Sequence, residues 1–317
     1  MERQRDLAEA FLDPRMLELG QLAGLADAVD WTPLDALAAS LHGQAEGRPP
    51  YPPAMMLRSL YLQALYDLSD PGMEKALLYR IDFRLFCGFS LSERTPDETT
   101  LCRFRNAAIA AGVVDKVFAE VNRQLEAKGL MVKKGTLIDA TVVSAASRRP
   151  VADKGAKPQL RREPDATFTR KNGKSYFGWR LHIAVDQGSG LVRRAIVTPA
   201  HINESSVADA LICGDEQAIY ADKGYESKER RQALRSRGIK DRIMHRSHKY
   251  QASLPHWQVV RNRLITPRRA PVEAVFGTLK RTYRRARSRF YGLTATTPDL
   301  IRTLTGYNLR RAAALTA

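Results

Sequence analysis

The sequence predicts an α/β protein in which an all-α N-terminal domain precedes a domain built on a mixed sheet. Apolar residues in the first 130 positions recur with the period of amphipathic helices. Near residue 135 the pattern changes to short β-branched runs, which are typical of strands. From there on, predicted strands alternate with predicted helices, and this order is typical of a sheet covered by helices.

The composition indicates a globular protein of roughly two domains. The chain has 317 residues, of which 44% are hydrophobic and 27% charged, and these values exclude collagen, coiled coil and wholesale disorder. No apolar run approaches the ~18 residues that cross a bilayer, and the N-terminus has no apolar signal core. We therefore expect a cytoplasmic protein with no membrane partner.

The net charge of +17 is divided unevenly along the chain. Residues 1–130 carry 14 Lys and Arg against 19 Asp and Glu, a net charge of −5, whereas residues 131–317 carry 37 against 15, a net charge of +22. A segment this basic predicts a polyanionic partner, most simply nucleic acid. A basic surface that only aids solubility is the alternative.

Helix signals in the first domain are clearest in two places. Met55–Leu68 carries an apolar stripe at helical spacing, and Asp70-Pro71-Gly72 is expected to break that helix. Thr95 is expected to cap a second helix that continues to about Ala111, with Glu98 completing a capping box.

The second domain is expected to begin with a buried strand over Thr136–Val143. The connector 144–175 holds nine Lys and Arg against three acids and is expected to be a loop, flexible or ordered by DNA. Strands over 177–185 and 191–197 should form a hairpin. The basic stretch 244–269 shows no clear period. The other predicted elements are helices over 204–213, 228–237, 271–289 and 299–315, and strands over 218–221 and 239–243.

Three carboxylates stand where a charge is costly or unexpected. Asp139 lies inside an apolar strand, where a charge needs a metal or another partner. Asp222 follows the strand 218–221, at the strand end where α/β sheets usually bind ligands. Glu273 opens a predicted helix and is the only acidic residue between positions 244 and 298. The alternatives are a strand end or hydrogen bonds to backbone amides for Asp139, a cap of the next turn for Asp222, and a favourable interaction with the helix macrodipole for Glu273.

Three carboxylates from two strands and a helix can hold a pair of divalent cations. Their oxygen ligands suit Mg²⁺ or Mn²⁺. Two such ions about 4 Å apart serve phosphodiester chemistry, and the basic surroundings identify nucleic acid as the substrate. We expect Asp139, Asp222 and Glu273 to be catalytic metal ligands for two Mg²⁺ ions, for which Mn²⁺ can substitute.

Several cationic or aromatic residues are expected to contact DNA, although solvent exposure alone is the alternative for each. On one uninterrupted helix, Glu273, Lys280 and Arg284 would share a face. Trp257 lies among basic residues and is expected to stack on an unpaired base. The helix after Thr95 carries two candidates for base readout, and the connector carries five candidate phosphate contacts: Arg103 and Arg105, then Arg161, Arg162, Arg170, Lys171 and Lys174.

At these positions the sequence resembles bacterial insertion-sequence transposases of the DDE class, closest to insertion-sequence family five. The resemblance covers roughly residues 50–312, and five motifs in the same order make it specific. Relatives often carry Tyr where this chain has Thr266, so a step that depends on that Tyr is in question. The five motifs are Thr95–Arg105, Leu137–Thr141, Thr198–Ser205, Ala221–Tyr225, and Arg269-x3-Glu273-x6-Lys280.

The resemblance implies an RNase H-like catalytic domain over residues 131–317, which includes the basic loop 144–175. The first and fourth strands of such a fold are neighbours, so Asp139 and Asp222 would lie side by side, with Glu273 supplied from a helix. The domain 1–130 would serve end recognition, dimerisation or both. Arg269 and Lys280 would position phosphate near the scissile bond.

The resemblance also implies the activity and the partners. We expect a DNA transposase, associated with the nucleoid, that cuts at the inverted ends of its insertion sequence and joins the 3′-OH ends to target DNA by transesterification. Its partners would be the double-stranded DNA of both sites and further copies of itself, in a homodimer or larger assembly. A structure-selective nuclease that only hydrolyses, and a non-catalytic DNA-binding protein derived from a transposase, are the alternatives.

Overall fold

The computed structural model describes most of the chain, namely residues 7–41, 50–147, 163–171, 173–247 and 253–316. The chain forms two compact units, residues 1–128 together with 301–317, and residues 129–300. The long helix α12 (Leu293–Thr316) contributes residues to both. The division expected from the sequence differs at 301–317, which it placed with the sheet. No helix in the described ranges is long and apolar enough to cross a membrane.

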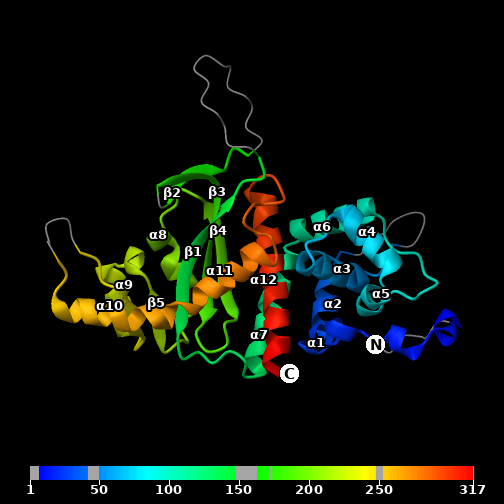
Figure 1. Cartoon of the computed structure of the whole chain (residues 1–317), viewed down its shortest axis with the longest axis horizontal. Helices are drawn as coiled ribbons and strands as arrows, with labels where there is room; N and C mark the ends of the chain where they lie inside the picture. The colour runs from blue at the N-terminus through cyan, green and yellow to red at the C-terminus, as the bar shows by residue number, and fades with distance from the viewer. Residues whose placement is uncertain (1–6, 42–49, 148–162, 172, 248–252, 317) are drawn as a thin grey trace, which may run out of the picture. The chain divides into compact units, whose positions relative to one another are not determined.

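The first unit consists of helices in the residues that are described (Figure 1). Its part of α12 packs closely on its other helices, since a Cβ on Gly306 would lie 2.8 Å from Leu65. Asn308 of α12 donates a hydrogen bond of 2.8 Å to Asn122. These contacts explain why the C-terminal residues group with this unit. Before α12, the helices are η1 (Leu7–Phe11), η2 (Pro14–Leu17), η3 (Gly20–Leu22), α1 (Ala23–Asp27), α2 (Trp31–Ala39), α3 (Pro53–Leu65), α4 (Asp70–Tyr79), α5 (Ile81–Cys87), α6 (Glu98–Ala110) and α7 (Val113–Ala127).

Two helix starts differ from expectation because an acid or a serine caps better than the residue first considered. Asp97, not Thr95, is the N-cap of α6, and its carboxylate accepts from the backbone N–H of Thr100. Asp70-Pro71-Gly72 does not simply break the preceding helix but opens α4, which Ser69 caps. Pro71 fits there because the first helical turn needs no backbone donor.

The second unit contains a six-stranded mixed sheet. The central strand β1 (Thr136–Ser144) pairs antiparallel with β3 (Lys174–Asp186) and parallel with β5 (Ala218–Ala221). The hairpin partner β4 (Val192–Pro199) and β2 (Thr167–Lys171) both pair antiparallel with β3. At the other edge, β6 (Lys240–Ile243) pairs parallel with β5. Leaving aside the small β2, the first and fourth strands are neighbours, and the expected RNase H-like fold class is confirmed.

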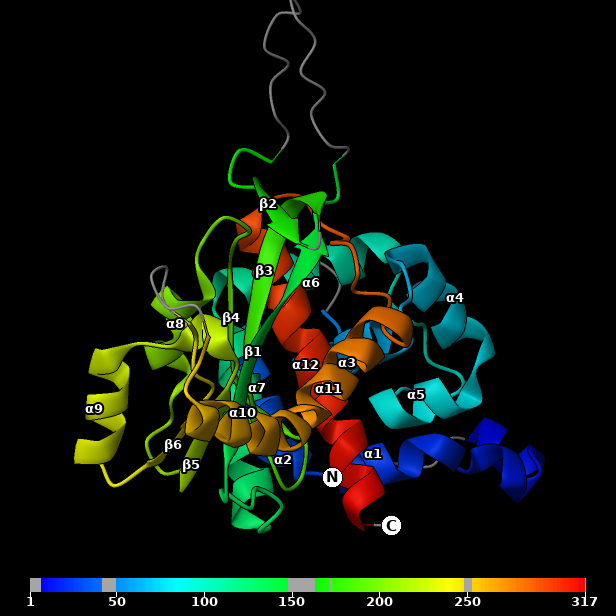
Figure 2. The same cartoon turned by 60° about the vertical axis from the view of Figure 1, so that its left-hand side comes forward.

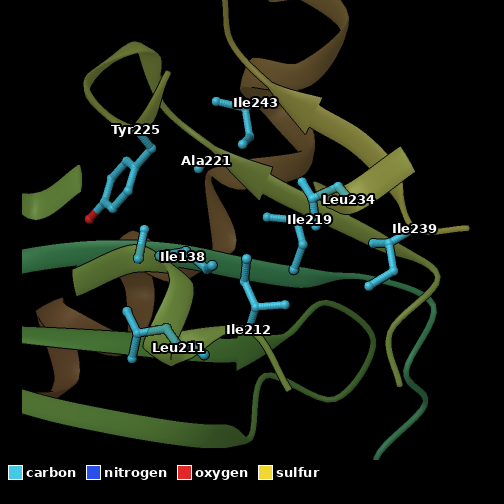
Figure 3. Close-up of a cluster of buried hydrophobic side chains, with 11 residues drawn as sticks. Ile138, Leu211, Ile212, Ile219, Ala221, Tyr225, Leu234, Ile239 and Ile243 are labelled. Atoms are coloured by element: carbon cyan, nitrogen blue, oxygen red, sulfur yellow. The ribbon is translucent and has the colours of Figure 1, made fainter. Parts of the chain in front are cut away.

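Helices cover the two faces of this sheet, as Figures 1 and 2 show. On one face, α8 (Glu204–Leu211) and α9 (Lys228–Ser236) bury an apolar cluster that includes Ile138 and Ile219 (Figure 3). Side chains alternate along a strand, so Asp139, next to Ile138, points to the opposite face. A second pair of helices packs there, α10 (His256–Arg269) and α11 (Pro271–Arg281).

Three segments of this unit differ from the expected elements. The connector 144–175 contains β2, which pairs with β3, so the described part of it belongs to the sheet. The stretch 244–269 contains α10, whose apolar residues are mostly exposed and therefore give no amphipathic stripe. The helix from Pro271 ends at Arg281, because the following chain turns and Ser288 donates a backbone hydrogen bond to Ser144 of β1.

Candidate active site

Asp139 is the one predicted acid that lies within a strand. It lies in the middle of β1 opposite Ile183 of β3, and its side chain is 16% exposed. Its Oδ1 accepts a hydrogen bond of 2.8 Å from the backbone N–H of Ala140. Its Oδ2 accepts one of 2.7 Å from Arg269 Nη1. The strand therefore holds the carboxylate at a fixed point on the sheet face covered by α10 and α11.

Asp222 directly follows β5, the strand that pairs with β1. In the parallel pair of β1 and β5, Thr136 is opposite Ile219 and Leu137 is opposite Tyr220. The same register continued along both strands places Asp139 opposite Asp222. Asp222 also begins the short helix η4 (Lys223–Tyr225), where its Oδ1 accepts a hydrogen bond of 2.7 Å from Gly224 N. It thus combines the cap considered from the sequence with the expected place beside Asp139.

Glu273 reaches the same group through Arg269. Arg269 is the last residue of α10 and Glu273 is in the first turn of α11, four residues later. Arg269 Nη2 lies 3.5 Å from Glu273 Oε1, while its Nη1 binds Asp139. One guanidinium therefore bridges the buried acid of the strand and the 67% exposed acid of the helix. The two are 134 positions apart in the sequence.

Electrostatics at Asp139 favour added positive charge. Burial raises the pKa of this carboxyl, Arg269 lowers it in part, and the neighbouring Asp222 raises it again. The net direction is upward even with the guanidinium in contact. Carboxylate oxygens whose charge is incompletely compensated are suitable ligands for Mg²⁺.

A fourth acid near this group was missed from the sequence. Glu204 is the first residue of α8, and its Oε1 lies 3.4 Å from Arg180 Nη1. Burial raises the pKa of Glu204, which Arg180 lowers in part and which Asp139 and Asp222 raise. Glu204 lies inside the motif Thr198–Ser205, and an acid directly after a strand and a turn was the signal available.

Four cationic side chains lie along β2, the start of β3 and α11. Lys171 and Lys174 are exposed and pair with each other in the hairpin register of β2 and β3, and Arg170 is exposed beside them. Lys280 on α11 is half-buried; burial lowers its pKa, and the positive charge of Lys171 lowers it further. Among the described residues, no carboxylate forms an ion pair with Lys280 or Lys171. This region therefore favours an anion.

Trp257 occupies the exposed side of α10. Its side chain is 59% exposed, and its ring makes an edge contact with His245 at a centroid distance of 5.1 Å. It borders a cavity of about 350 Å³ that is also lined by Leu264 and by arginines such as Arg242. An aromatic ring beside guanidinium groups suits a nucleobase next to its phosphate.

The structure does not bring every predicted contact to this region. Arg105 is buried in the helical unit, where it forms an ion pair with Asp70, so it is not on an exposed recognition surface; Arg103 of the same helix is exposed. Arg284 lies beyond the end of α11 with φ at +53°, and therefore does not share a helix face with Glu273. Thr266 is exposed on α10, and its hydroxyl donates to its own helix backbone. Two expected contacts lie outside the described residues, Arg161 and Arg162.

Another group of potential ligands in the same unit is already neutralised. Cys213, Asp215 and Glu216 bring their ligand atoms within 4.8 Å of one another. Asp215 forms ion pairs with Lys133 at 2.7 Å and with Arg193 at 2.5 Å. Glu216 accepts hydrogen bonds from three successive backbone N–H groups as well. This arrangement satisfies the acids internally, which identifies it as a structural network.

Two family models match this chain, and two solved structures are similar to it. A transposase domain of the DUF772 type matches residues 13–107, and a transposase DDE domain matches residues 131–309. Among solved structures, a piggyBac transposase synaptic complex with hairpin DNA is 11% identical, with a TM-score of 0.46, and the match covers 100% of this chain and 78% of that one. The Mos1 strand transfer complex is 9% identical, with a TM-score of 0.20 and coverage of 78% and 82%.

The transposase DDE domain covers more than half of the chain and includes the strands and helices that carry Asp139, Asp222 and Glu273. The transposase domain that precedes it matches the helical unit. These two matches, in this order, agree with the architecture described above. The chain belongs to the family of DDE transposases.

Proposed function

We propose that this transposase cuts DNA at the inverted ends of its own insertion sequence, joins the 3′-OH ends to target DNA, and belongs to insertion-sequence family five. One observation carries the proposal: the buried Asp139 and the helix acid Glu273 converge on a single guanidinium, Arg269, beside the strand end that bears Asp222. A basic chain segment surrounds this acidic group, as binding of a DNA backbone requires.

Asp139, Asp222 and Glu273 would hold two Mg²⁺ ions, for which Mn²⁺ can substitute. The fit rests on the oxygen donors and on the raised pKa of Asp139, which Arg269 alone does not compensate. Asp139 and Asp222 would hold the ions together with Glu273. When bound, the ions supply activation of the attacking oxygen and stabilisation of the leaving oxygen.

The side chains have separate tasks in this scheme. Asp139 stays on its strand because Ala140 donates to its Oδ1, so the acid is preorganised. Arg269, which contacts both Asp139 and Glu273, would position the scissile phosphate next to these acids. Lys280, half-buried and without a carboxylate partner among the described residues, binds the adjacent phosphate and gains charge stabilisation from it.

Cutting and joining are two successive displacements at phosphorus. First, water attacks the phosphodiester, the bond to the 3′ oxygen breaks, and a 3′-OH and a 5′-phosphate remain. Then that 3′-OH attacks a target phosphodiester, forming one P–O bond while another breaks and the displaced oxygen takes up the proton. The second step conserves the number of phosphodiester bonds and needs no external energy source. The same three carboxylates serve both steps.

The remaining contacts and the assembly follow from this reaction. Arg170, Lys171 and Lys174 would bind the DNA backbone, and Trp257 would stack on a base unpaired near the cut. The exposed Arg103 would contact DNA from the helical unit. Two element ends must be joined in one event, so we propose a homodimer or larger homo-oligomer.

The test uses the full chain, Mg²⁺ and duplexes that carry the ends of its own genomic element. We expect strand cuts that map to the element boundary, followed by transfer of the labelled 3′-OH strand into a plasmid. Cleavage without transfer identifies a nuclease instead. Specific binding without metal-dependent cleavage identifies a DNA-binding protein that has lost catalysis.

A further inference from the structure

The position of Glu204 points to a role in the active site that the three-acid motif does not assign. It begins α8, directly after β4, and Asn203 caps the helix by accepting from Ser205 N at 2.9 Å. This helix packs against β1, β3 and η4, which are the elements next to Asp139 and Asp222. The helix start therefore brings its first side chain near η4, at the end of β5 where Asp222 lies.

The surroundings of Gly224 show how close the carboxylates of Asp222 and Glu204 lie to each other. A Cβ on this glycine would lie 3.0 Å from Asp222 Oδ1 and 3.9 Å from Glu204 Oε2, so these two oxygens are at most 6.9 Å apart, the sum of the two distances. Ligand oxygens of a two-ion centre span up to about 8 Å, given ions about 4 Å apart and Mg–O distances of about 2 Å. Glu204 Oε2 is within that span of Asp222.

Arg180 holds Glu204 by its other oxygen. Its Nη1 lies 3.4 Å from Glu204 Oε1 and donates to the carbonyl of Ile202 at 3.0 Å. Its Nη2 donates to Thr169 Oγ1 at 3.0 Å. These bonds fix the guanidinium between β2, β3 and the loop before α8. Glu204 is thus positioned from its Oε1 side, while its Oε2 faces the turn of Asp222.

An unsatisfied hydroxyl gives independent evidence that something binds here. The Tyr225 side chain is fully buried, and its hydroxyl has no hydrogen-bond partner among the described residues. The negative charges of Glu204, Asp139 and Asp222 all act on this hydroxyl. Figure 3 shows this hydroxyl directed away from Ile219. A buried hydroxyl keeps its place at a cost unless an acceptor is supplied.

We propose that Glu204 is a fourth acidic ligand of the divalent-cation site, positioned by Arg180 and adding its Oε2 to the oxygens of Asp139 and Asp222. The inference rests on the metal site of the proposed function. The Tyr225 hydroxyl, which has no partner among the described residues, is available as a donor at this site.

Mn²⁺ binding to the full chain, measured by electron paramagnetic resonance in the absence of DNA, tests the proposal without any activity readout. Glu204→Gln should weaken Mn²⁺ binding by at least about tenfold. Asp209→Asn is the matched control, because Asp209 lies on the same helix and also pairs with an arginine, Arg230, at 2.7 Å. It should bind Mn²⁺ like the wild type.

The outcomes separate this proposal from the proposed function. If Asp222→Asn weakens binding and Glu204→Gln does not, Glu204 is not a ligand, although the metal site stands. If neither Asp139→Asn nor Asp222→Asn changes Mn²⁺ binding, the metal site itself is wrong. An equal loss in Asp209→Asn and Glu204→Gln attributes the effect to the helix and rejects the proposal.

A second measurement needs no variant and so does not depend on how Glu204→Gln folds. Fe²⁺ replaces Mg²⁺ in the wild-type chain, and hydroxyl radicals generated at the ion cut the nearby backbone. We expect cuts close to Glu204 in addition to those near Asp139 and Asp222. Cuts near the two aspartates with none near Glu204 would overturn the proposal.

Discussion

Two acidic clusters in the sheet unit are stabilised in opposite ways. At Asp215, burial acts to raise the pKa, but hydrogen bonds from Lys133 and Arg193 outweigh it and the pKa is lowered. At Asp139, burial raises the pKa and Arg269 does not outweigh it. The first cluster is complete as folded, while the second retains negative charge that an external cation can compensate. The difference distinguishes a structural ion network from a site prepared for ligands.

The largest expected effect comes from removing one acid of the second cluster, which consists of Asp139, Asp222 and Glu273. Asp139→Asn, Asp222→Asn or Glu273→Gln should each reduce DNA cleavage and joining by roughly 10³-fold or more, because each would remove a ligand of the proposed ions, which would contribute several kcal/mol to the transition state. Binding of element ends should stay near the wild-type level. Cleavage and filter binding on the same preparations measure both, and wild-type cleavage in all three variants would reject the site.

A substitution in the first cluster, which consists of Cys213, Asp215 and Glu216, should lower the stability of the fold and leave catalysis intact. Glu216→Gln removes one partner of the 4% exposed Arg193 and should lower the free energy of unfolding by roughly 3 kcal/mol. Urea unfolding measures this change, and Asp139→Asn is the comparison. If Glu216→Gln abolished cleavage at a temperature where it is folded, the structural role of the first cluster would be refuted.

The buried His182 should make the stability of the sheet unit depend on pH. This contribution must be separated from that of the acids. Burial, with a smaller contribution from Arg180, lowers the pKa of His182 from 6.5 to about 4. Between those values the unfolded chain binds more protons, so stability is complete above pH 6.5 and is lost as the pH falls toward 4.

The variant His182→Gln keeps a donor for Thr198 but does not titrate. Between pH 6.5 and 4, the wild type should lose roughly 2 kcal/mol of unfolding free energy relative to this variant. Urea unfolding across the pH range measures the difference. Parallel pH profiles would show that His182 titrates alike in both states.

The smallest expected effect concerns Lys280, the half-buried cation of α11. Lys280→Ala should slow cleavage by the bound complex roughly tenfold, the effect of about 1.4 kcal/mol, since one phosphate contact is lost in the transition state. Affinity should change less. Arg281→Ala is the control, because Arg281 is the next residue of α11, is exposed and donates to its own helix at Gly277. Equal rates for both variants would make Lys280 an ordinary surface cation.

Local pattern was sufficient to predict most of the sheet. Thr136–Ser144 and Ala218–Ala221 are short apolar runs, and β-branched residues in the first favour strands. An acid inside one run and directly after the other identified Asp139 and Asp222 before any contact was known. Glu273 stood out because the surrounding stretch has no other acid.

The local sequence pattern failed to predict the structure where solvent exposure or a residue far away in the sequence decides it. Helix α10 was not predicted, since Ile265 is its only buried residue in the structure and no apolar stripe marks it. Arg105 resembled a DNA contact in sequence, but Asp70, 35 positions earlier, takes it into the core of the helical unit. In neither case does the neighbouring sequence contain the feature that decides the structure.

The sequence by itself determined the residue types and the chemistry they allow: acids on strands, cations around them and a strongly basic second half of the chain. Only the tertiary structure decided which of these groups meet. Arg269 contacts Asp139 across 130 positions, and Glu204 approaches Asp222 because α8 packs on the same sheet. Such contacts depend on sheet register and helix packing, which are set by burial of the whole core and not by any local run of residues.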